Sequence, residues 1–288
     1  MTLFLTGANG QLGRALQAIA PADTRVVATD LPDLDITDAD AVGAAIAAAR
    51  PTLVINCAAH TAVDAAETEG ALSAAINARA PGLIAAAARA AGARMIHVST
   101  DFVFDGARST PYPPEAAPSP LGVYGRTKRD GELAVLAAYP EALVVRTAWV
   151  YAAQGRNFVH TMLRLMRDRG AVSVVADQIG TPTWATTLAR ALLGLDAAGA
   201  TGFHHATDAG AASWYDFAVA IAEEALALGL LPAMPVITPI RTQDYPTPAA
   251  RPAYSVLDKT STWALLGAPA PHWRESLRAM LSELKALS

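Results

Sequence analysis

The chain has 288 residues, 52% of them hydrophobic and 17% charged, so it can bury a sizeable core and is not a disordered protein. A net charge of −4 without any run of basic residues argues against a nucleic-acid partner. The single cysteine, Cys57, excludes an internal disulfide and a cysteine-based zinc site. We expect a cytoplasmic protein with no membrane partner, because the apolar runs at 1–6 and 85–91 are too short for a signal peptide or a membrane span.

Short β-branched runs alternate with longer alanine-rich runs through the first half of the chain. We predict buried strands at 3–6, 25–30, 52–56, 94–99 and 142–147. We predict helices at 11–20, 38–50, 67–91 and 125–138, with Asp38 and Pro81 where helices begin or break and Gly92 where the long helix ends. This alternation predicts a parallel sheet with helices on both faces.

The pattern is looser after residue 147. A helix and a strand at 172–175 are expected between residues 148 and 176, followed by a loop at 177–184. Further helices are predicted at 185–196, 214–228 and 273–287. The proline-rich segment 232–252 is expected to be extended.

The loop after the first predicted strand has glycines spaced Gly-x-x-Gly-x-x-Gly and opens the first helix. Glycine suits a tight turn and a close backbone approach to a pyrophosphate, which the helix N-terminus also attracts. The candidate cofactor contacts here are Gly7, Asn9, Gly10, Gln11, Leu12 and Gly13. We therefore predict an α/β fold with a Rossmann-type doubly wound parallel sheet at 1–150. A smaller, partly interleaved C-terminal α/β substrate domain is predicted at 151–288, with some segments returning to the sheet.

An acidic residue, Asp30, closes the second predicted strand, 23 residues after Gly7. A carboxylate at this place can accept hydrogen bonds from the adenosine ribose hydroxyls, and it disfavours the 2′-phosphate of NADP. No arginine follows it, so the residues alone leave the choice between NADPH and NADH open. Asp35 and Ile36 are placed to flank the adenine.

Tyr124 and Lys128 lie four residues apart at the start of a predicted helix, which places both on one face. A nearby ammonium stabilises a phenolate, so we expect Lys128 to lower the pKa of Tyr124 toward neutrality. Tyr124 could then exchange a proton with a substrate oxygen while hydride moves to or from carbon. Because the chain has only three lysines, a chance match to this spacing is rare.

Polar residues also end the fourth predicted strand, where side chains of such sheets face the ligand cleft. Thr100 is the candidate to hydrogen-bond a reacting carbonyl oxygen, with Asp101 as a helper. Without the other two motifs, the preferred interpretation would be that Thr100 only caps the end of the strand.

Together these motifs resemble the dTDP-4-dehydrorhamnose reductase family of extended short-chain dehydrogenases/reductases. The stretches that carry the resemblance are 56–64, 99–106, 146–151, 177–183 and 245–252. The resemblance implies that NAD(P)H reduces the 4-keto group of dTDP-6-deoxy-L-lyxo-4-hexulose to dTDP-L-rhamnose, with NADPH the expected cofactor and NADH the alternative.

The resemblance also implies roles for individual residues. Tyr124 protonates the nascent hydroxyl, Lys128 holds the nicotinamide ribose, and Thr100 and Asp101 contact the sugar. Trp149 packs against the sugar, and Arg251, whose planar guanidinium suits phosphate, binds the substrate diphosphate. The further cofactor contacts are Ala58, Ala59 and His60. For His60 a positional or packing role is favoured over a catalytic one, and His204 and His205 are expected to be structural.

Some relatives hold Mg²⁺ at a dimer interface with two glutamates, and this chain differs at both positions. By our alignment they are Ala15 and Thr186, and alanine offers no side-chain oxygen to a hard cation. We therefore predict no intrinsic metal and no metal-bridged dimer, which favours a monomer over a weak homodimer.

Two other functions remain open at this level. One is a nucleotide-sugar epimerase or dehydratase of the same fold, although no Asp-Glu pair for dehydration lies beside Thr100. The other is a non-catalytic, NADP-binding regulatory subunit like the relatives that regulate methionine adenosyltransferase. Against the latter, Thr100, Tyr124 and Lys128 are all present.

Overall fold

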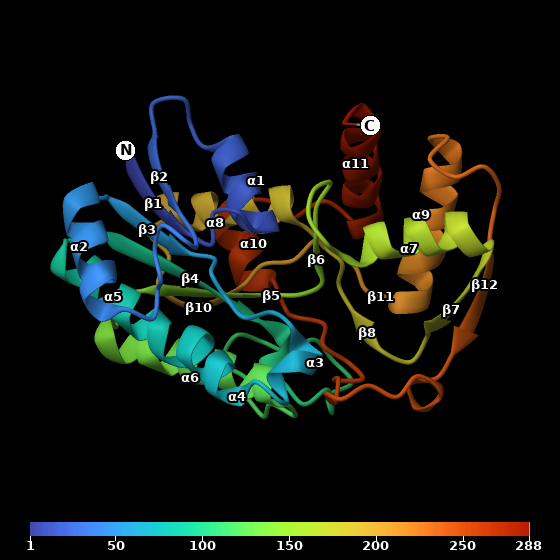
Figure 1. Ribbon diagram of the computed structural model, residues 1–288, viewed down its shortest axis with the longest axis horizontal. Coiled ribbons are helices and arrows are strands. Elements are labelled where there is room, and N and C mark those ends of the chain that lie inside the picture. The colour runs from blue at the N-terminus through green and yellow to red at the C-terminus, as the bar shows by residue number, and fades with distance from the viewer. Residues whose placement is uncertain (288) are drawn as a thin grey trace.

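The computed structural model describes residues 1–287 and shows two lobes side by side (Figure 1). The larger lobe is built on a six-stranded sheet in the order β10-β5-β4-β3-β1-β2, with every pair parallel. Its strands are β1 (Thr2–Thr6), β2 (Arg25–Thr29), β3 (Leu53–Asn56), β4 (Arg94–Thr100), β5 (Leu143–Thr147) and β10 (Gly202–His205). The predicted Rossmann-type parallel sheet is thus confirmed.

Both faces of the large sheet are covered by helices because both faces of its strands are apolar. Leu3 and Leu5 of β1 pack on one side and Phe4 on the other, as the two-residue period of a strand requires. On the first face lie α1 (Gln11–Ile19) and α8 (Ala185–Ala197). On the second face lie α2 (Ala39–Ala49), α5 (Ala80–Ala90) and α6 (Val123–Ala138).

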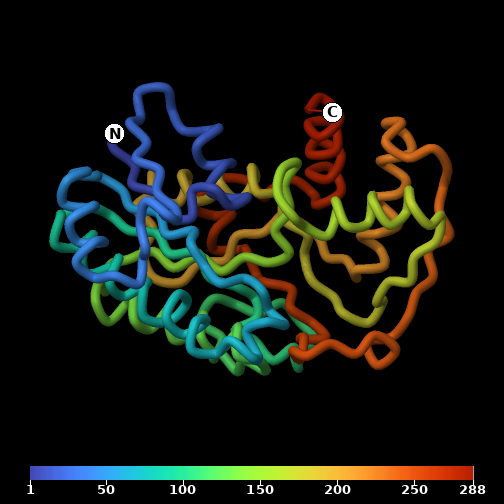
Figure 2. Tube along the Cα trace, viewed as in Figure 1, coloured from blue at the N-terminus to red at the C-terminus, as the bar shows by residue number. Residues whose placement is uncertain are grey.

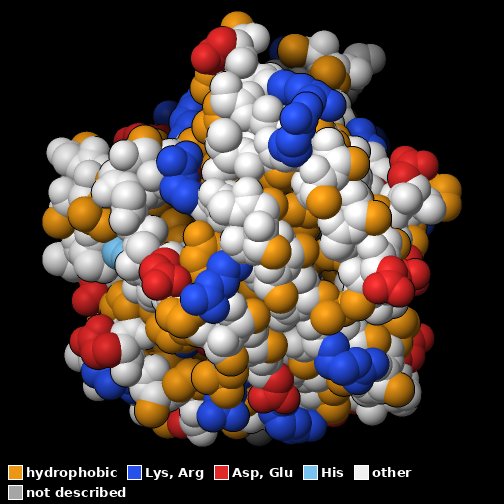
Figure 3. Space-filling model, turned by 90° about the vertical axis from the view of Figure 1, so that its left-hand side faces the viewer, with side chains coloured by type: hydrophobic (Ala, Val, Ile, Leu, Met, Phe, Trp, Pro, Cys, Tyr) orange, Lys and Arg blue, Asp and Glu red, His pale blue; other side chains and the backbone are white. Residues whose placement is uncertain are grey.

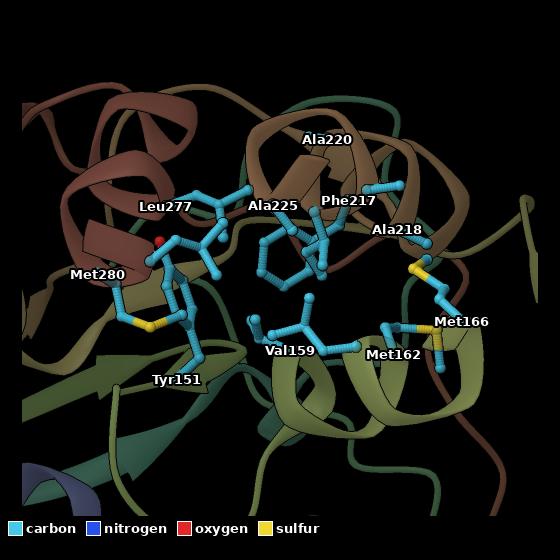
Figure 4. Close-up of a cluster of buried hydrophobic side chains, with 14 of the residues drawn as sticks. Tyr151, Val159, Met162, Met166, Phe217, Ala218, Ala220, Ala225, Leu277 and Met280 are labelled. Atoms are coloured by element: carbon cyan, nitrogen blue, oxygen red, sulfur yellow. The ribbon is translucent and has the colours of Figure 1, made fainter. Parts of the chain in front are cut away.

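The smaller lobe packs three helices against short strands. The helices are α7 (Phe158–Arg169), α9 (Trp214–Ala227) and α11 (Trp273–Ala286). The strands are β6 (Val150–Tyr151), β7 (Ala171–Val175), β8 (Ile179–Gly180), β9 (Thr183–Trp184), β11 (Ala212–Ser213) and β12 (Val236–Ile240). Tyr151, Phe217 and Leu277 lie in its apolar core (Figure 4). The chain crosses between the lobes more than once, since β10 and α10 (Thr260–Leu266) lie in the larger lobe (Figure 2).

The single long helix predicted at 67–91 is confirmed as one continuous helical run, Gly70–Ala90, that contains a π-helical stretch. This run consists of α4 (Gly70–Ser73), a π-helix η1 (Ala74–Arg79) and then α5, and the short helix α3 (Val63–Ala66) precedes it. The wide π turn carries Asn77, whose side chain bonds to neighbouring elements as described below, and π turns are frequent at functional sites. By length and composition the run Gly70–Ala90 could cross a membrane, but it packs here against α6 and, through α5, against α2.

The surface of the larger lobe carries both signs of charge. On the face seen in Figure 3, Lys and Arg side chains are interspersed with Asp and Glu. This distribution accords with the small net charge of −4.

Candidate active site

The glycine loop and the end of β3 touch each other. Gly7 has a φ of 68°, and a Cβ on it would lie 2.6 Å from the backbone nitrogen of Ala58. A Cβ on Gly13 would lie 2.3 Å from the carbonyl oxygen of Gly7, so α1 can pack this close only with glycine there. The predicted cofactor residues Gly7, Gly13 and Ala58 are therefore brought together, while Leu12 points into the apolar core.

Asp30 ties the glycine loop to the end of β2. Its Oδ2 accepts from the Asn9 amide at 2.9 Å, and its Oδ1 accepts from the Leu31 amide at 2.9 Å. Each carboxylate oxygen keeps a lone pair, so Asp30 can still accept from a ribose hydroxyl. Gly10 caps α1 without a side-chain bond, which leaves amides of the helix N-terminus for a phosphate. The loop fits a dinucleotide.

Three other predicted cofactor residues have their side chains engaged within the protein. Asp35 accepts from the amide and the hydroxyl of Thr37, and these hydrogen bonds lower its pKa. Ile36 packs against the core beneath α2. The Gln11 Oε1 accepts from the Asn157 side-chain amide at 2.8 Å, which links α1 to the start of α7.

Tyr124 and Thr100 meet at the carboxyl end of the sheet. The Tyr124 phenol lies beside the Thr100 hydroxyl, which donates to Asp101 Oδ1 at 3.1 Å. The close approach of α6 to β4 depends on Gly125, because a Cβ there would lie 2.2 Å from the Phe102 carbonyl oxygen. The sequence Tyr-Gly thus places the phenol beside the strand end. The edge of the Phe102 ring packs against Tyr124, with ring centroids 5.5 Å apart.

The pKa of Tyr124 is shifted in the direction opposite to our expectation. Burial raises it to about 12; a hydrogen bond from Thr100 opposes the shift, and the Asp101 charge adds to it. Lys128 does not contribute, since its ammonium turns toward β4 and donates to the Val98 carbonyl at 2.7 Å. Burial lowers the pKa of Lys128 itself to about 8, against the charge of Glu132. Tyr124 therefore holds its proton at neutral pH.

Asp101 is a fully buried acid beside these groups. Burial raises its pKa to about 6, although hydrogen bonds from Ser255 and Thr100 favour the carboxylate. Ser255 belongs to the C-terminal part of the chain and was missed by the sequence argument, which offers no motif for it. Its contact brings the segment after Arg251 to the end of β4.

His60 is held in place by contacts with neighbouring elements. Its backbone amide donates to Asn77 Oδ1 at 2.8 Å, and its ring lies 3.2 Å from Glu69. Asn77, fully buried on η1, also bonds to the Thr127 hydroxyl, which lies on α6 between Tyr124 and Lys128. Asn77 was missed, and its one signal is a polar side chain inside an alanine-rich helical run. His205, on β10, is buried and bonds to the Asp258 carbonyl, as a structural residue does.

Trp149 and Arg251, the other two predicted substrate residues besides Thr100 and Asp101, lie near the junction of the lobes, and each is held by protein groups. The Trp149 ring stacks on that of Trp214, with centroids 3.4 Å apart and planes 5° apart. The Arg251 guanidinium forms a two-point ion pair with Asp64, at 2.8 and 3.1 Å.

A cleft of about 670 Å³ opens between α7, β7, β12 and residues 245–251. Its polar and aromatic lining includes Arg169, Gln178, Trp214, Tyr245 and Arg251. Two guanidinium groups in one cleft suit a doubly charged group such as a diphosphate. Except for Arg251, these lining residues were not identified from the sequence.

Comparison with known proteins identifies the family of this chain. The model of the RmlD substrate binding domain family matches residues 1–286. The chain belongs to this family. A relative from Aggregatibacter actinomycetemcomitans, named dTDP-4-dehydrorhamnose reductase, is 41% identical over 96% of this chain and 97% of its own.

Two further similar proteins bear on substrate and cofactor. A Streptomyces antibioticus relative, 44% identical over 99% of this chain and 96% of its own, is named as a probable dTDP-4,6-dihydroxy-2-methyloxan-3-one 4-ketoreductase. The crystal structure of a Bacillus anthracis dTDP-4-dehydrorhamnose reductase in complex with NADP has a TM-score of 0.92 and 36% identity. That match covers 98% of this chain and 99% of that one.

Proposed function

We propose that this RmlD-family chain reduces the 4-keto group of dTDP-6-deoxy-L-lyxo-4-hexulose, giving dTDP-L-rhamnose. The observation that carries the proposal is the placement of Thr100, at the end of β4, beside Tyr124, at the start of α6, at the carboxyl end of the sheet. Reduction of a ketone needs a proton donor and a donor to the carbonyl oxygen, and this pair offers both. The names of the relatives from Aggregatibacter and Bacillus anthracis agree with this reaction.

Tyr124 is the proposed proton donor. When bound, the reduced nicotinamide supplies a hydride to C4 of the sugar, and the phenol proton goes to the carbonyl oxygen. A pKa of about 12 keeps Tyr124 protonated throughout the neutral range, which is the form that reduction consumes. The Thr100 hydroxyl donates to Asp101 Oδ1 in the free protein, and on substrate binding it would turn to donate its proton to the same carbonyl oxygen. Lys128 holds a ribose hydroxyl with its buried ammonium.

The sugar nucleotide is proposed to lie across the junction of the lobes. Arg169 and Arg251 in the cleft would bind its diphosphate, and the exposed aromatic ring of Tyr245 would flank its base. Arg251 can reach the ligand because its ion pair with Asp64 leaves the guanidinium partly exposed. Trp149 would form the wall of the sugar site.

We also propose that NADPH is the cofactor, with NADH used as well. The NADP complex of the Bacillus anthracis relative supports NADPH, while the Asp30 carboxylate at the ribose position supports NADH. The protein is proposed to act in the cytoplasm as a monomer, without a metal bound through Ala15 and Thr186.

The test is nicotinamide absorbance with purified protein, NADPH or NADH, and enzymatically generated dTDP-6-deoxy-L-lyxo-4-hexulose. Oxidation that depends on this sugar supports the reductase, and Tyr124→Phe is the matched inactive control. A second assay uses the keto sugar specified by the name of the Streptomyces antibioticus relative. Faster oxidation with that sugar would replace the proposed substrate. No oxidation with either sugar, despite measured cofactor binding, would favour an epimerase or a regulatory subunit.

A further inference from the structure

Trp149 has an unusual backbone conformation. Its φ is 47°, and among the described residues the other non-glycine with positive φ is Arg50, which caps α2. A bulky side chain in this region is strained and persists only where the surroundings determine it. Trp149 lies two residues beyond Thr147, which pairs with Thr100 across β4 and β5. The strain is therefore located at the catalytic end of the sheet.

Both faces of the Trp149 ring are covered by the smaller lobe. The Trp214 ring lies against one face at 3.4 Å. A Cβ on Gly180 would be 2.6 Å from Cε2 of Trp149. Because no atom fits between two rings stacked this closely, Gly180 must lie against the opposite face of the Trp149 ring. If alanine replaced Gly180, the Trp149 ring would have to move by roughly 1 Å to restore a van der Waals distance of 3.4 Å or more to the added methyl group.

The two sides of this clamp belong to one rigid unit. Gly180 of β8 pairs with Ala212 of β11, and Ser213 then caps α9, whose first residue is Trp214. The Ser213–Asp216 capping box fixes the start of that helix. Gly180 and Trp214 are thus held at a set distance by paired strands and a capped helix, with the Trp149 ring between them.

We propose that Gly180 and Trp214 are positioning residues that fix the Trp149 ring and so set the depth at which the keto sugar lies against Tyr124. The inference rests on the proposed reductase function. With both faces covered, Trp149 presents only its edge to the sugar, and the ring forms a fixed wall. The Trp214 ring also lines the cleft proposed for the nucleotide, so the clamp joins the sugar site to that cleft.

The decisive variant is Gly180→Ala, assayed with NADPH and dTDP-6-deoxy-L-lyxo-4-hexulose. A ring shift of roughly 1 Å should lower kcat/KM for the sugar by about 10- to 100-fold, while the Kd for NADPH stays unchanged. In a Trp149→Phe background, where the smaller ring leaves room for the added methyl, Gly180→Ala should change kcat/KM by less than about twofold. Gly43→Ala, at an open position of α2, is the matched glycine control.

Trp214→Phe tests the clamp without adding bulk. Two stacked indoles couple their electronic transitions, so this variant should lose a pair of circular-dichroism bands of opposite sign that Trp263→Phe, on α10, retains. Its KM for the sugar should rise at least about threefold with the Kd for NADPH unchanged.

The proposal is overturned if both Gly180→Ala and Trp214→Phe keep wild-type kcat and KM for the sugar. It is also overturned if Gly180→Ala costs as much in the Trp149→Phe background as alone, because the loss would then not pass through the ring. Absence of turnover in the wild-type protein would instead refute the proposed function. The loss of the circular-dichroism bands in Trp214→Phe would then still test the clamp.

Discussion

Glu132→Gln is predicted to destabilise the protein strongly, because it leaves a buried charge without its partner. The Arg146 guanidinium contacts both Glu132 carboxylate oxygens at 2.8 Å, and the two side chains are 2% and 1% exposed. Arginine stays charged at any working pH, and removing one partner of a buried pair costs about 3–5 kcal/mol. The rings of Phe104 and Phe203 flank the guanidinium, at 5.1 and 4.4 Å from its carbon, and cannot replace a carboxylate.

Thermal unfolding followed by circular dichroism measures this loss. For a chain of this order of size, each kcal/mol corresponds to about 2–4 °C, so the Tm should fall by roughly 10 °C. Asp196→Asn is the matched control, since it also breaks a two-point pair with an arginine. Arg94 in that pair is 57% exposed, so the loss should stay below about 1 kcal/mol. Equal losses in the two variants would refute the reasoning.

Glu132 also lies one helical turn after Lys128 on α6. Its charge raises the pKa of Lys128, so Glu132→Gln should lower that pKa further below about 8. The alkaline limb of the pH profile of kcat should then move to lower pH. An unchanged limb in a folded variant would show that Lys128 does not titrate in the working range.

Other variants test the remaining parts of the site. Tyr124→Phe should lower kcat by about 10²–10⁴-fold with cofactor binding intact, and near-wild-type turnover would remove it from the mechanism. Gly13→Ala should abolish measurable cofactor binding by fluorescence titration, since a Cβ would lie 2.3 Å from a backbone oxygen; a wild-type Kd would contradict this. Asp30→Asn should raise the ratio of kcat/KM for NADPH to that for NADH by about tenfold, by removing a negative charge near the 2′-phosphate. Because burial raises the pKa of Asp101 from 3.8 to about 6, its carboxylate costs stability above about pH 6 and none below about pH 4. Asp101→Asn should therefore be up to about 3 kcal/mol more stable at pH 7, an advantage that disappears as the pH falls to 4.

The large sheet could be predicted from the sequence because its strands are buried on both faces. Such strands appear as continuous apolar runs, and β1 to β5 lie within one or two residues of their predicted bounds. The ends of these strands carry the glycine loop and Thr100, and α6 places Tyr124 beside Thr100, so the place of the site followed from the fold. The predicted roles of these residues remain to be tested.

The smaller lobe was harder to predict because its pairings depend on tertiary contacts. Strand β12, in a proline-rich run predicted only as extended, pairs in parallel with β7 far earlier in the chain. Helix α10 was not predicted. The orientation of Lys128 could not be inferred from spacing, because the Val98 carbonyl competes for its ammonium. The clamp of Gly180 and Trp214 around Trp149 has no local sequence signal.

The position of β10 has a consequence for synthesis of the chain. Strand β5 pairs with β10 along its outer edge, and Leu188, Leu192 and Leu195 of α8 cover the sheet face beside it. A nascent chain that ends at residue 150 therefore has an unpaired apolar strand edge and a sheet face that α1 alone covers, which are features that promote aggregation. The larger lobe can be completed only after residue 205 has left the ribosome. Helix α7 and strands β6 to β9 of the smaller lobe precede that residue, so they emerge while the larger lobe is still incomplete.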